Sequence, residues 1–198
     1  MKEMYKFGMG GLLISILFGC SDHENFIPKP ATYLELNTPE RVYEEYHDSC
    51  GYSFQKPTYF EVNHVKGSGC NRDIRFSSLN GVLHLSVIDM DTTLGTYVNY
   101  SIDKVDEHKI KATAIYDSTI LRPNDKVYGT FFELQGNVAS PFQFYMTDST
   151  NWFMSGVVYF NTHPNYDSIK PTLDFVKKDL FKLMETISLD SKEFDDSM

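Results

Sequence analysis

Three cysteines are the residues of this chain with the most definite chemistry. Cys20 ends an apolar stretch near the N-terminus, whereas Cys50 and Cys70 lie further along the chain. The latter two do not match a zinc-binding pattern, because neither has a His or Cys at a short ligand spacing. In an oxidising compartment we expect them to form a disulfide, which would stabilise the fold by roughly 3 kcal/mol; a free or reactive thiol is the alternative.

Known catalytic motifs are missing from the sequence. It contains no Gly-x-Ser-x-Gly, Walker-type phosphate loop, His-Glu-x-x-His or Gly-x-Gly-x-x-Gly, and its six histidines are scattered singly. Asp89 and Asp91 could face a cation, but the end of a strand before a helix cap requires the same residues. Tyr145, Asp148 and Ser149 could form an acid–base set, although a turn also favours Asp and Ser. We therefore expect no enzyme activity, metal or cofactor.

The N-terminus has the pattern of a bacterial lipoprotein signal peptide. Lys2 and Lys6 precede roughly a dozen apolar residues, which are too few for an ordinary transmembrane helix. The sequence Leu17-Phe18-Gly19-Cys20 resembles the lipobox, where a signal peptidase cuts before a cysteine that then carries lipid. We expect removal of residues 1–19 and a covalent lipid on Cys20, whose palmitate-type acyl chains anchor the protein. The alternative is a plain signal peptide or a membrane anchor.

The rest of the chain divides into a tether, a domain and a tail. Residues 20–30 are polar and end in Pro28-Lys29-Pro30, which favours an extended segment. Residues 31–189 have the length and apolar content of a single domain, and residues 190–198 form an acidic tail. The net charge of −9 argues against nucleic acid as a partner, because phosphate binding needs a basic surface.

Residues 126–161 give the clearest indication of the fold. Three aromatic-rich runs, separated by short polar breaks, predict an antiparallel β-meander. The third run is apolar on both faces, which indicates that both sides of the sheet are covered. Two helices are expected, over residues 91–111 and from Asp167 or Ser168 onward. The second carries a long apolar stripe, typical of a helix that faces the core or, alternatively, a coiled-coil partner.

Weaker patterns complete the predicted fold. They indicate strands over residues 31–37, 58–65, 81–88 and 111–121, the last broken at Asp117-Ser118-Thr119, and a short helical turn within residues 40–48. Because strands and helices occur in separate groups, the expected class is α+β: an antiparallel β-sheet with a C-terminal meander, packed by two main helices.

Several motifs spread over most of the chain carry a resemblance to a known family. They include Pro28-Lys29-Pro30, Cys50-Gly51-Tyr52-Ser53-Phe54, Asp125-Lys126-Val127-Tyr128-Gly129, Gly136-Asn137-Val138-Ala139-Ser140 and the runs at residues 143–150, 164–169 and 183–186. Together they resemble the gliding motility lipoprotein family GldD of Bacteroidetes. The resemblance implies a lipoprotein needed for the gliding machinery, which in this phylum is coupled to type IX secretion. It assigns no catalytic residues.

The hypothesis that follows is a non-enzymatic assembly or stabilising factor. Its lipid would hold it to a cell-envelope membrane facing the periplasm, with the outer membrane favoured over the inner one and surface export as an option. Its partners would be other envelope proteins of gliding motility or type IX secretion.

Two turns are the predicted docking surfaces for these partners. One contains Gly136 and Asn137, the other contains Asp148, and Phe142 and Trp152 border them as aromatic anchors. These residues could instead form ordinary turns and core aromatics. The alternative function is a binding module for a small ligand or glycan, and an unrecognised hydrolase is a third.

Overall fold

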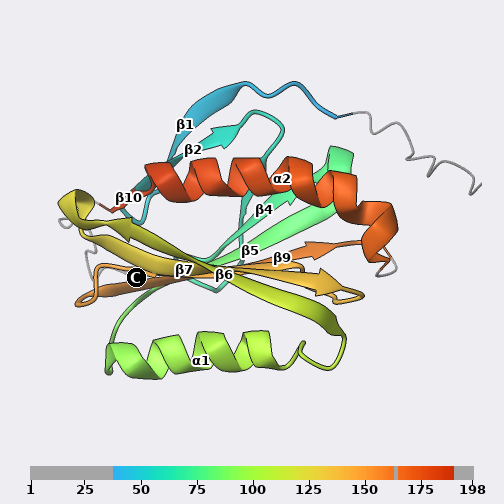
Figure 1. Ribbon diagram of the computed structural model, residues 1–198. Coiled ribbons are helices and arrows are strands. Elements are labelled where there is room, and N and C mark those ends of the chain that lie inside the picture. The colour runs from blue at the N-terminus through green and yellow to red at the C-terminus, as the bar shows by residue number, and fades with distance from the viewer. Residues whose placement is uncertain (1–37, 163–164, 190–198) are drawn as a thin grey trace, which may run out of the picture. The chain divides into compact units, whose positions relative to one another are not determined.

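The computed structural model describes residues 38–162 and 165–189. They form a seven-stranded sheet, a three-stranded sheet and two α-helices, which confirms the predicted α+β class (Figure 1). The predicted signal peptide, the tether, the strand at residues 31–37 and the acidic tail lie outside the described residues.

Antiparallel pairing joins every neighbouring pair of strands in both sheets. The large sheet has the order β3-β4-β5-β9-β8-β7-β6, and the small sheet has the order β1-β2-β10. The elements are β1 (Tyr43–His47), β2 (Tyr52–Pro57), β3 (Glu61–His64), β4 (Arg72–Phe76), η1 (Ser77–Leu79), β5 (Gly81–Asp89), α1 (Leu94–Asp106), β6 (Ala112–Arg122), η2 (Pro123–Asp125), β7 (Val127–Gly136), β8 (Phe142–Thr147), β9 (Trp152–Phe160), α2 (Tyr166–Thr186) and β10 (Ser188–Leu189).

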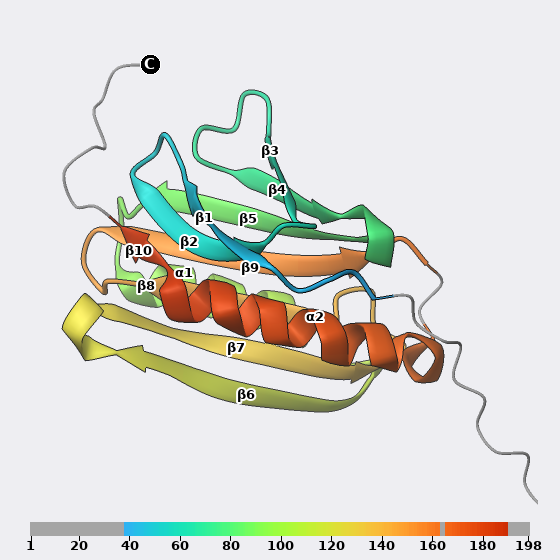
Figure 2. The ribbon, with the colours of Figure 1, turned by 90° about the horizontal axis from the view of Figure 1, so that it is seen from above.

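The two faces of the large sheet are covered differently. Helix α1 lies along one face, whereas α2 and the small sheet lie side by side over the other (Figures 1 and 2). We call these the α1 face and the α2 face. Helix α2 also contacts the small sheet, because the backbone N–H of Gln55 in β2 donates to Oγ1 of Thr186 over 2.9 Å. The predicted cover on both sides of β9 is therefore present.

The predicted meander is formed by β7, β8 and β9. Phe144 of β8 pairs in register with Phe131 on one side and with Gly156 on the other. A Cβ atom at position 156 would lie 2.2 Å from the Phe144 ring, so glycine is needed to let this ring pack across β9. Phe142, Phe144 and Met146 are all buried and share one face of β8, as their alternation predicted.

Helix α2 supplies most of the cover on its face. Its buried side chains recur at helical spacing and include Leu173, Val176, Leu180 and Leu183. The helix begins earlier than predicted, because Asn165 is the N-cap and its side chain accepts a hydrogen bond from the N–H of Ser168. Sequence inspection favoured the neighbouring Asp and Ser, which are equally good capping residues.

Three local predictions were wrong. Residues 40–48 contain strand β1 in place of a helical turn, because β2 pairs with β1 along its whole length. Strand β6 runs unbroken through Asp117-Ser118-Thr119, whose polar side chains are exposed at the edge of the sheet. Helix α1 is shorter than residues 91–111, and its apolar Ile102 side chain is exposed.

A disulfide between Cys50 and Cys70 joins the two sheets. It links the turn after β1 to the segment that precedes β4, with the two Cα atoms 5.8 Å apart. The same region holds a buried ion pair between Asp48 and Arg72, whose Oδ1 and Nη2 atoms are 2.6 Å apart. Covalent and ionic links therefore both fix the small sheet over the large one.

Candidate functional site

The two predicted docking turns lie at opposite ends of strand β8. Residues 137–141 connect β7 to β8, and residues 148–151 connect β8 to β9. Because the three strands are successive and antiparallel, the turns cannot belong to one small contact patch. The two predicted aromatic anchors are not accessible to a partner, since Phe142 and Trp152 are both buried in the core.

The polar residues of these turns have local structural roles. Gly136 has φ +111°, and a Cβ there would lie 2.7 Å from the carbonyl oxygen of Lys111. Oδ1 of Asn137 accepts a hydrogen bond from the N–H of Tyr166 at the start of α2 over 3.2 Å. Docking at these turns stays a prediction, and only their exposed polar edges are open to a partner.

Asp148 organises the second turn. Its Oδ1 accepts hydrogen bonds from the backbone N–H groups of Thr150, Asn151 and Trp152 over 2.9, 2.8 and 3.1 Å. Burial raises the pKa of this carboxyl, but the hydrogen bonds outweigh burial, so the pKa is lowered overall. The carboxylate is therefore held in its charged form by the turn that it shapes.

A cavity of about 230 Å³ lies between α1 and the large sheet. Its lining residues come from α1 and from strands β5, β7, β8 and β9: Ser86, Tyr100, Ser101, Lys104, Phe132, Gln143, Phe144, Ser155, Gly156 and Val157. The cavity exists because small side chains stand where large ones would fill the space. Ser86 and Ser155 are direct neighbours in the register of β5 and β9, and Ser101 belongs to the helix above them.

Gln143 is the least satisfied polar residue of this cavity. Only 4% of its surface is exposed. Among the described residues, its Nε2 atom is the one buried side-chain nitrogen or oxygen without a hydrogen-bond partner. It stands between Phe132 of β7 and Val157 of β9 in the sheet register, both apolar. A buried amide donor without a partner costs about 1–3 kcal/mol, so its retention needs an explanation.

The cavity continues into an open furrow on the α1 face. A second hollow of about 240 Å³ shares Ser86, Ser155 and Val157 with it. A third, of about 310 Å³, shares Asp73 and His84 with the second. The furrow therefore follows β4, β5 and β9 from beneath α1 toward the sheet edge at β3, and polar groups such as the three serines lie among apolar surface in its lining.

Two of the cations along this furrow are paired with carboxylates, whereas Arg75 of the third hollow has no ion pair among the described residues. Nδ1 of His84 lies 2.6 Å from Oδ1 of Asp73, and Nζ of Lys104 lies 2.8 Å from Oε1 of Glu107. The ring of Tyr159 packs edge-on against His84, with 5.6 Å between ring centroids. Near the cavity the furrow thus presents hydroxyl, amide, aromatic and apolar groups, and its cations there are paired with carboxylates.

A fully buried carboxylate, Asp179 of α2, is the centre of a separate cluster. It accepts hydrogen bonds from Nε of Arg41 over 2.8 Å, from Oη of Tyr43 over 2.6 Å and from Oη of Tyr59. Burial and the bond to Asp179 raise the pKa of Tyr43 to about 12. The carboxylate is saturated by donors and is not open to a ligand, so this cluster fixes the N-terminal segment to α2.

Asp48 is held in the same way on the other side of the small sheet. Besides Arg72, it accepts hydrogen bonds from Oη of Tyr46 over 2.6 Å and from the N–H of Cys50 over 2.9 Å. Burial raises the pKa of Asp48, but these bonds and the ion pair outweigh burial and lower it overall. Both buried carboxylates thus serve the fold.

The arrangement offers binding groups but no evident reaction. Within residues 38–162 and 165–189, no group of three His, Cys, Asp or Glu side chains is placed to hold a metal ion. In the same part of the chain, neither helix is long and apolar enough to span a membrane. Sequence inspection missed the role of Gln143 and the three serines, although an amide inside an aromatic strand is an indication that could have been followed.

Comparison with known families places the chain among the lipoproteins. The family model that matches is described as gliding motility lipoprotein GldD, and it covers residues 23–189. Since the match spans most of the chain, the chain belongs to the GldD family, as its motifs predicted. Comparison with curated proteins finds no match. The matched region begins after Cys20, so lipidation of that residue stays a prediction.

Proposed function

We propose that this protein is a non-enzymatic assembly or stabilising component of the gliding machinery, linked to type IX secretion. A lipid on Cys20 would hold it at an envelope membrane, facing the periplasm. Membership of a gliding motility lipoprotein family supports the process and the envelope location. The contact with the machinery is proposed from one structural observation, the open edge of strand β6.

Among the described residues, strand β6 is long and has no neighbouring strand on its outer side. It has eleven residues and pairs with β7, and no other strand of the described residues pairs with it. Tyr116 and Leu121, which project to opposite faces of the strand, are 56% and 66% exposed. The opposite edge of the sheet is β3, which has only four residues. A long edge with a free row of backbone N–H and C=O groups recruits an extended segment from another chain.

The sequence of β6 does little to prevent such pairing. Protective edge strands carry lysines, prolines or inward-pointing charges, and the interior of β6 has only Asp117 as a charged residue. Arg122 at its end is already engaged, because its Nη1 donates to the carbonyl oxygens of Met184 and Ile187. The proposed occupant is an extended segment of a partner envelope protein, which satisfies this row of backbone groups.

Two adjacent proline substitutions test the proposal. Neighbouring residues of an edge strand direct their N–H groups alternately toward the sheet and away from it. One of Ser118→Pro and Thr119→Pro therefore removes an outward N–H and keeps the fold, whereas the other removes a bond to β7 and destabilises the protein. We expect cells carrying the folded variant to lose gliding while the lipoprotein is present at a normal level.

Thermal melting of the purified variants and immunoblots of cells identify which variant is folded and present. Normal gliding with that variant would overturn the edge contact. Photo-crosslinking from position 119 identifies the occupant: an adduct with a motility or secretion protein supports the proposal, whereas an adduct only between two copies of this chain contradicts it. Cys20→Ala serves as the anchoring control and is expected to release the protein from membranes and abolish gliding.

A further inference from the structure

We infer that the cavity beneath α1, together with the furrow that leaves it, binds a short neutral saccharide. This site is distinct from the β6 edge, and it goes beyond the proposed assembly role. The inference rests on three observations: an unpaired buried amide, three serine hydroxyls beside an aromatic ring in the cavity lining, and the pairing of the two cations nearest the cavity with carboxylates.

The unpaired amide indicates a ligand that carries hydrogen-bond acceptors. Nε2 of Gln143 has no protein partner although the residue is almost completely buried, and the residue lines the cavity. An acyl chain in the cavity would leave this donor unpaired. A ligand hydroxyl, ring oxygen or carbonyl group would satisfy it, and so recover the free energy that its burial costs.

The lining matches a molecule with many hydroxyl groups. Ser86, Ser101 and Ser155 supply hydroxyls that can both donate and accept hydrogen bonds. Tyr100 of α1, which is 63% exposed, is an aromatic ring of the same lining. Saccharides present both kinds of surface, because their hydroxyl edges are polar and their C–H faces pack on aromatic rings.

Charge and size argue against an ionic ligand and for an elongated one. Close to the cavity, Lys104 and His84 each have a carboxylate partner within hydrogen-bonding distance, so an anion would have to compete with Glu107 or Asp73. Arg75, which has no ion pair among the described residues, lines only the far hollow of the furrow. The cavity of about 230 Å³ is just below the usual range of about 300–1,000 Å³ for ligand pockets. Its continuation along β5 toward Asp73 and His84 provides the length for a second sugar ring.

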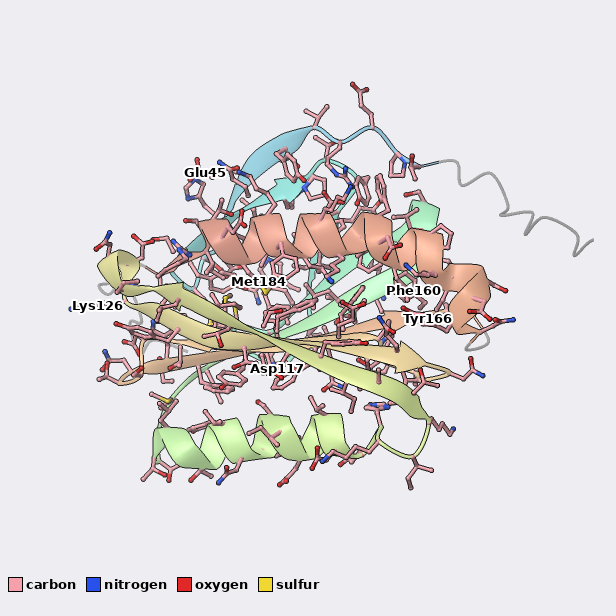
Figure 3. The ribbon with its side chains drawn as sticks, in the orientation of Figure 1. Glu45, Asp117, Lys126, Phe160, Tyr166 and Met184 are labelled. Carbon is pink, nitrogen blue, oxygen red and sulfur yellow. A yellow bond between two sulfur atoms is a disulfide. The ribbon has the colours of Figure 1, made fainter. Side chains whose placement is uncertain are left out.

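The fold also gives the ligand a way in. Val105 is the only buried residue of α1, and Tyr97 stacks on Phe153 with 5.3 Å between ring centroids, so few side chains hold the helix to the sheet. Figure 3 shows side chains between α1 and the sheet, and the buried Met184 of α2 on the opposite face.

Direct binding measurements test the inference. The full-length lipoprotein, purified in detergent, is titrated with cellobiose, maltose and N,N′-diacetylchitobiose, using saturation-transfer NMR and calorimetry. We expect at least one disaccharide to bind with a Kd below about 1 mM. Gln143→Leu should weaken that binding at least about tenfold, as expected when a buried hydrogen bond of roughly 1.4 kcal/mol is lost.

Control variants separate a real site from non-specific binding. Gln135→Leu, in which the lost amide has a protein partner in Glu133, should leave the affinity unchanged. Ser155→Leu fills the cavity and should abolish binding even if Gln143→Leu proves unstable. Failure of all three disaccharides to bind in the millimolar range would overturn the inference, as would equal affinity of wild type and a folded Ser155→Leu. The folded β6 proline variant should bind normally, so this result is independent of the edge contact.

Discussion

The two faces of the large sheet differ in how much apolar surface their helices bury. On the α2 face, a helix of 21 residues buries a continuous apolar stripe against aromatic side chains of the meander. On the α1 face, a helix of 13 residues buries one valine, which belongs to a small separate cluster with the buried Leu134 and Val138 and a few partly buried apolar residues. The first face stabilises the fold, and the second leaves a cavity and one buried amide nitrogen, Nε2 of Gln143, that has no hydrogen-bond partner among the described residues.

The treatment of polar groups differs in the same way. Asp179 on the α2 face is fully buried and receives hydrogen bonds from three side chains. Gln143 on the α1 face is nearly as buried, yet its amide nitrogen has no partner. The same fold therefore provides hydrogen-bond donors for a buried carboxylate on one face but no acceptor for a buried amide on the other. The difference is the one expected if the α1 face holds the proposed binding site.

The largest expected effect compares the two helices directly. Leu180→Ala, at a fully buried position of α2, should lower the free energy of unfolding by about 3 kcal/mol, since it removes apolar contacts and leaves a cavity. Ile102→Ala, on the exposed side of α1, should change it by less than about 0.5 kcal/mol. Denaturant titration of both variants measures the difference. Equal losses would show that α1 is as well packed as α2.

The second effect concerns the saturated carboxylate. Tyr43→Phe removes a 2.6 Å hydrogen bond to Asp179 and should lower the free energy of unfolding by about 1.5 kcal/mol. It should also change the response to alkali, because the pKa of Tyr43 is raised to about 12 in the folded protein. The stabilisation is complete below the ordinary tyrosine pKa of about 10 and is lost as the pH rises through about 12.

Denaturant titrations at pH 8 and above pH 10 follow that dependence. Wild type should lose more stability than Tyr43→Phe over this interval. Tyr116→Phe, at an exposed position of β6, is the matched control and should change stability by less than about 0.5 kcal/mol at either pH. An alkaline loss of the same size in wild type and in Tyr43→Phe would show that Tyr43 does not titrate with the fold.

Periodicity predicted the parts of the fold that are governed by one dominant local pattern. The meander and α2 follow from alternating and helical spacing of apolar residues, because each buries one continuous face. Strand β1 was missed because Glu44 and Glu45 interrupt the alternation, and only pairing with β2 stabilises an extended chain there. Strand β6 was predicted with a break because an edge strand tolerates exposed Asp, Ser and Thr in mid-strand.

The candidate site was harder to predict because its residues are ordinary in type. Ser86, Ser101 and Ser155 come from two strands and a helix, and only the register of β5 with β9 brings the first and last together. Alternation alone placed Gln143 on the less apolar side of β8, but burial and the absence of a partner depend on tertiary packing. Aromatic residues near turns were easier to notice, and they proved to belong to the core.

The smallest expected effect has the opposite sign from the others. Without a ligand, Gln143→Leu should raise the free energy of unfolding by about 1 kcal/mol, because an apolar side chain of similar size replaces an unpaired buried donor. Gln135→Leu, which removes an amide that donates to Oε1 of Glu133, should be neutral or slightly destabilising. Thermal and denaturant unfolding of both variants measure the difference. A loss of stability in Gln143→Leu would mean that bound water already accepts a hydrogen bond from the amide. A gain would show that the unpaired Gln143 amide lowers the stability of the free protein, as expected for a group that hydrogen-bonds only to a ligand.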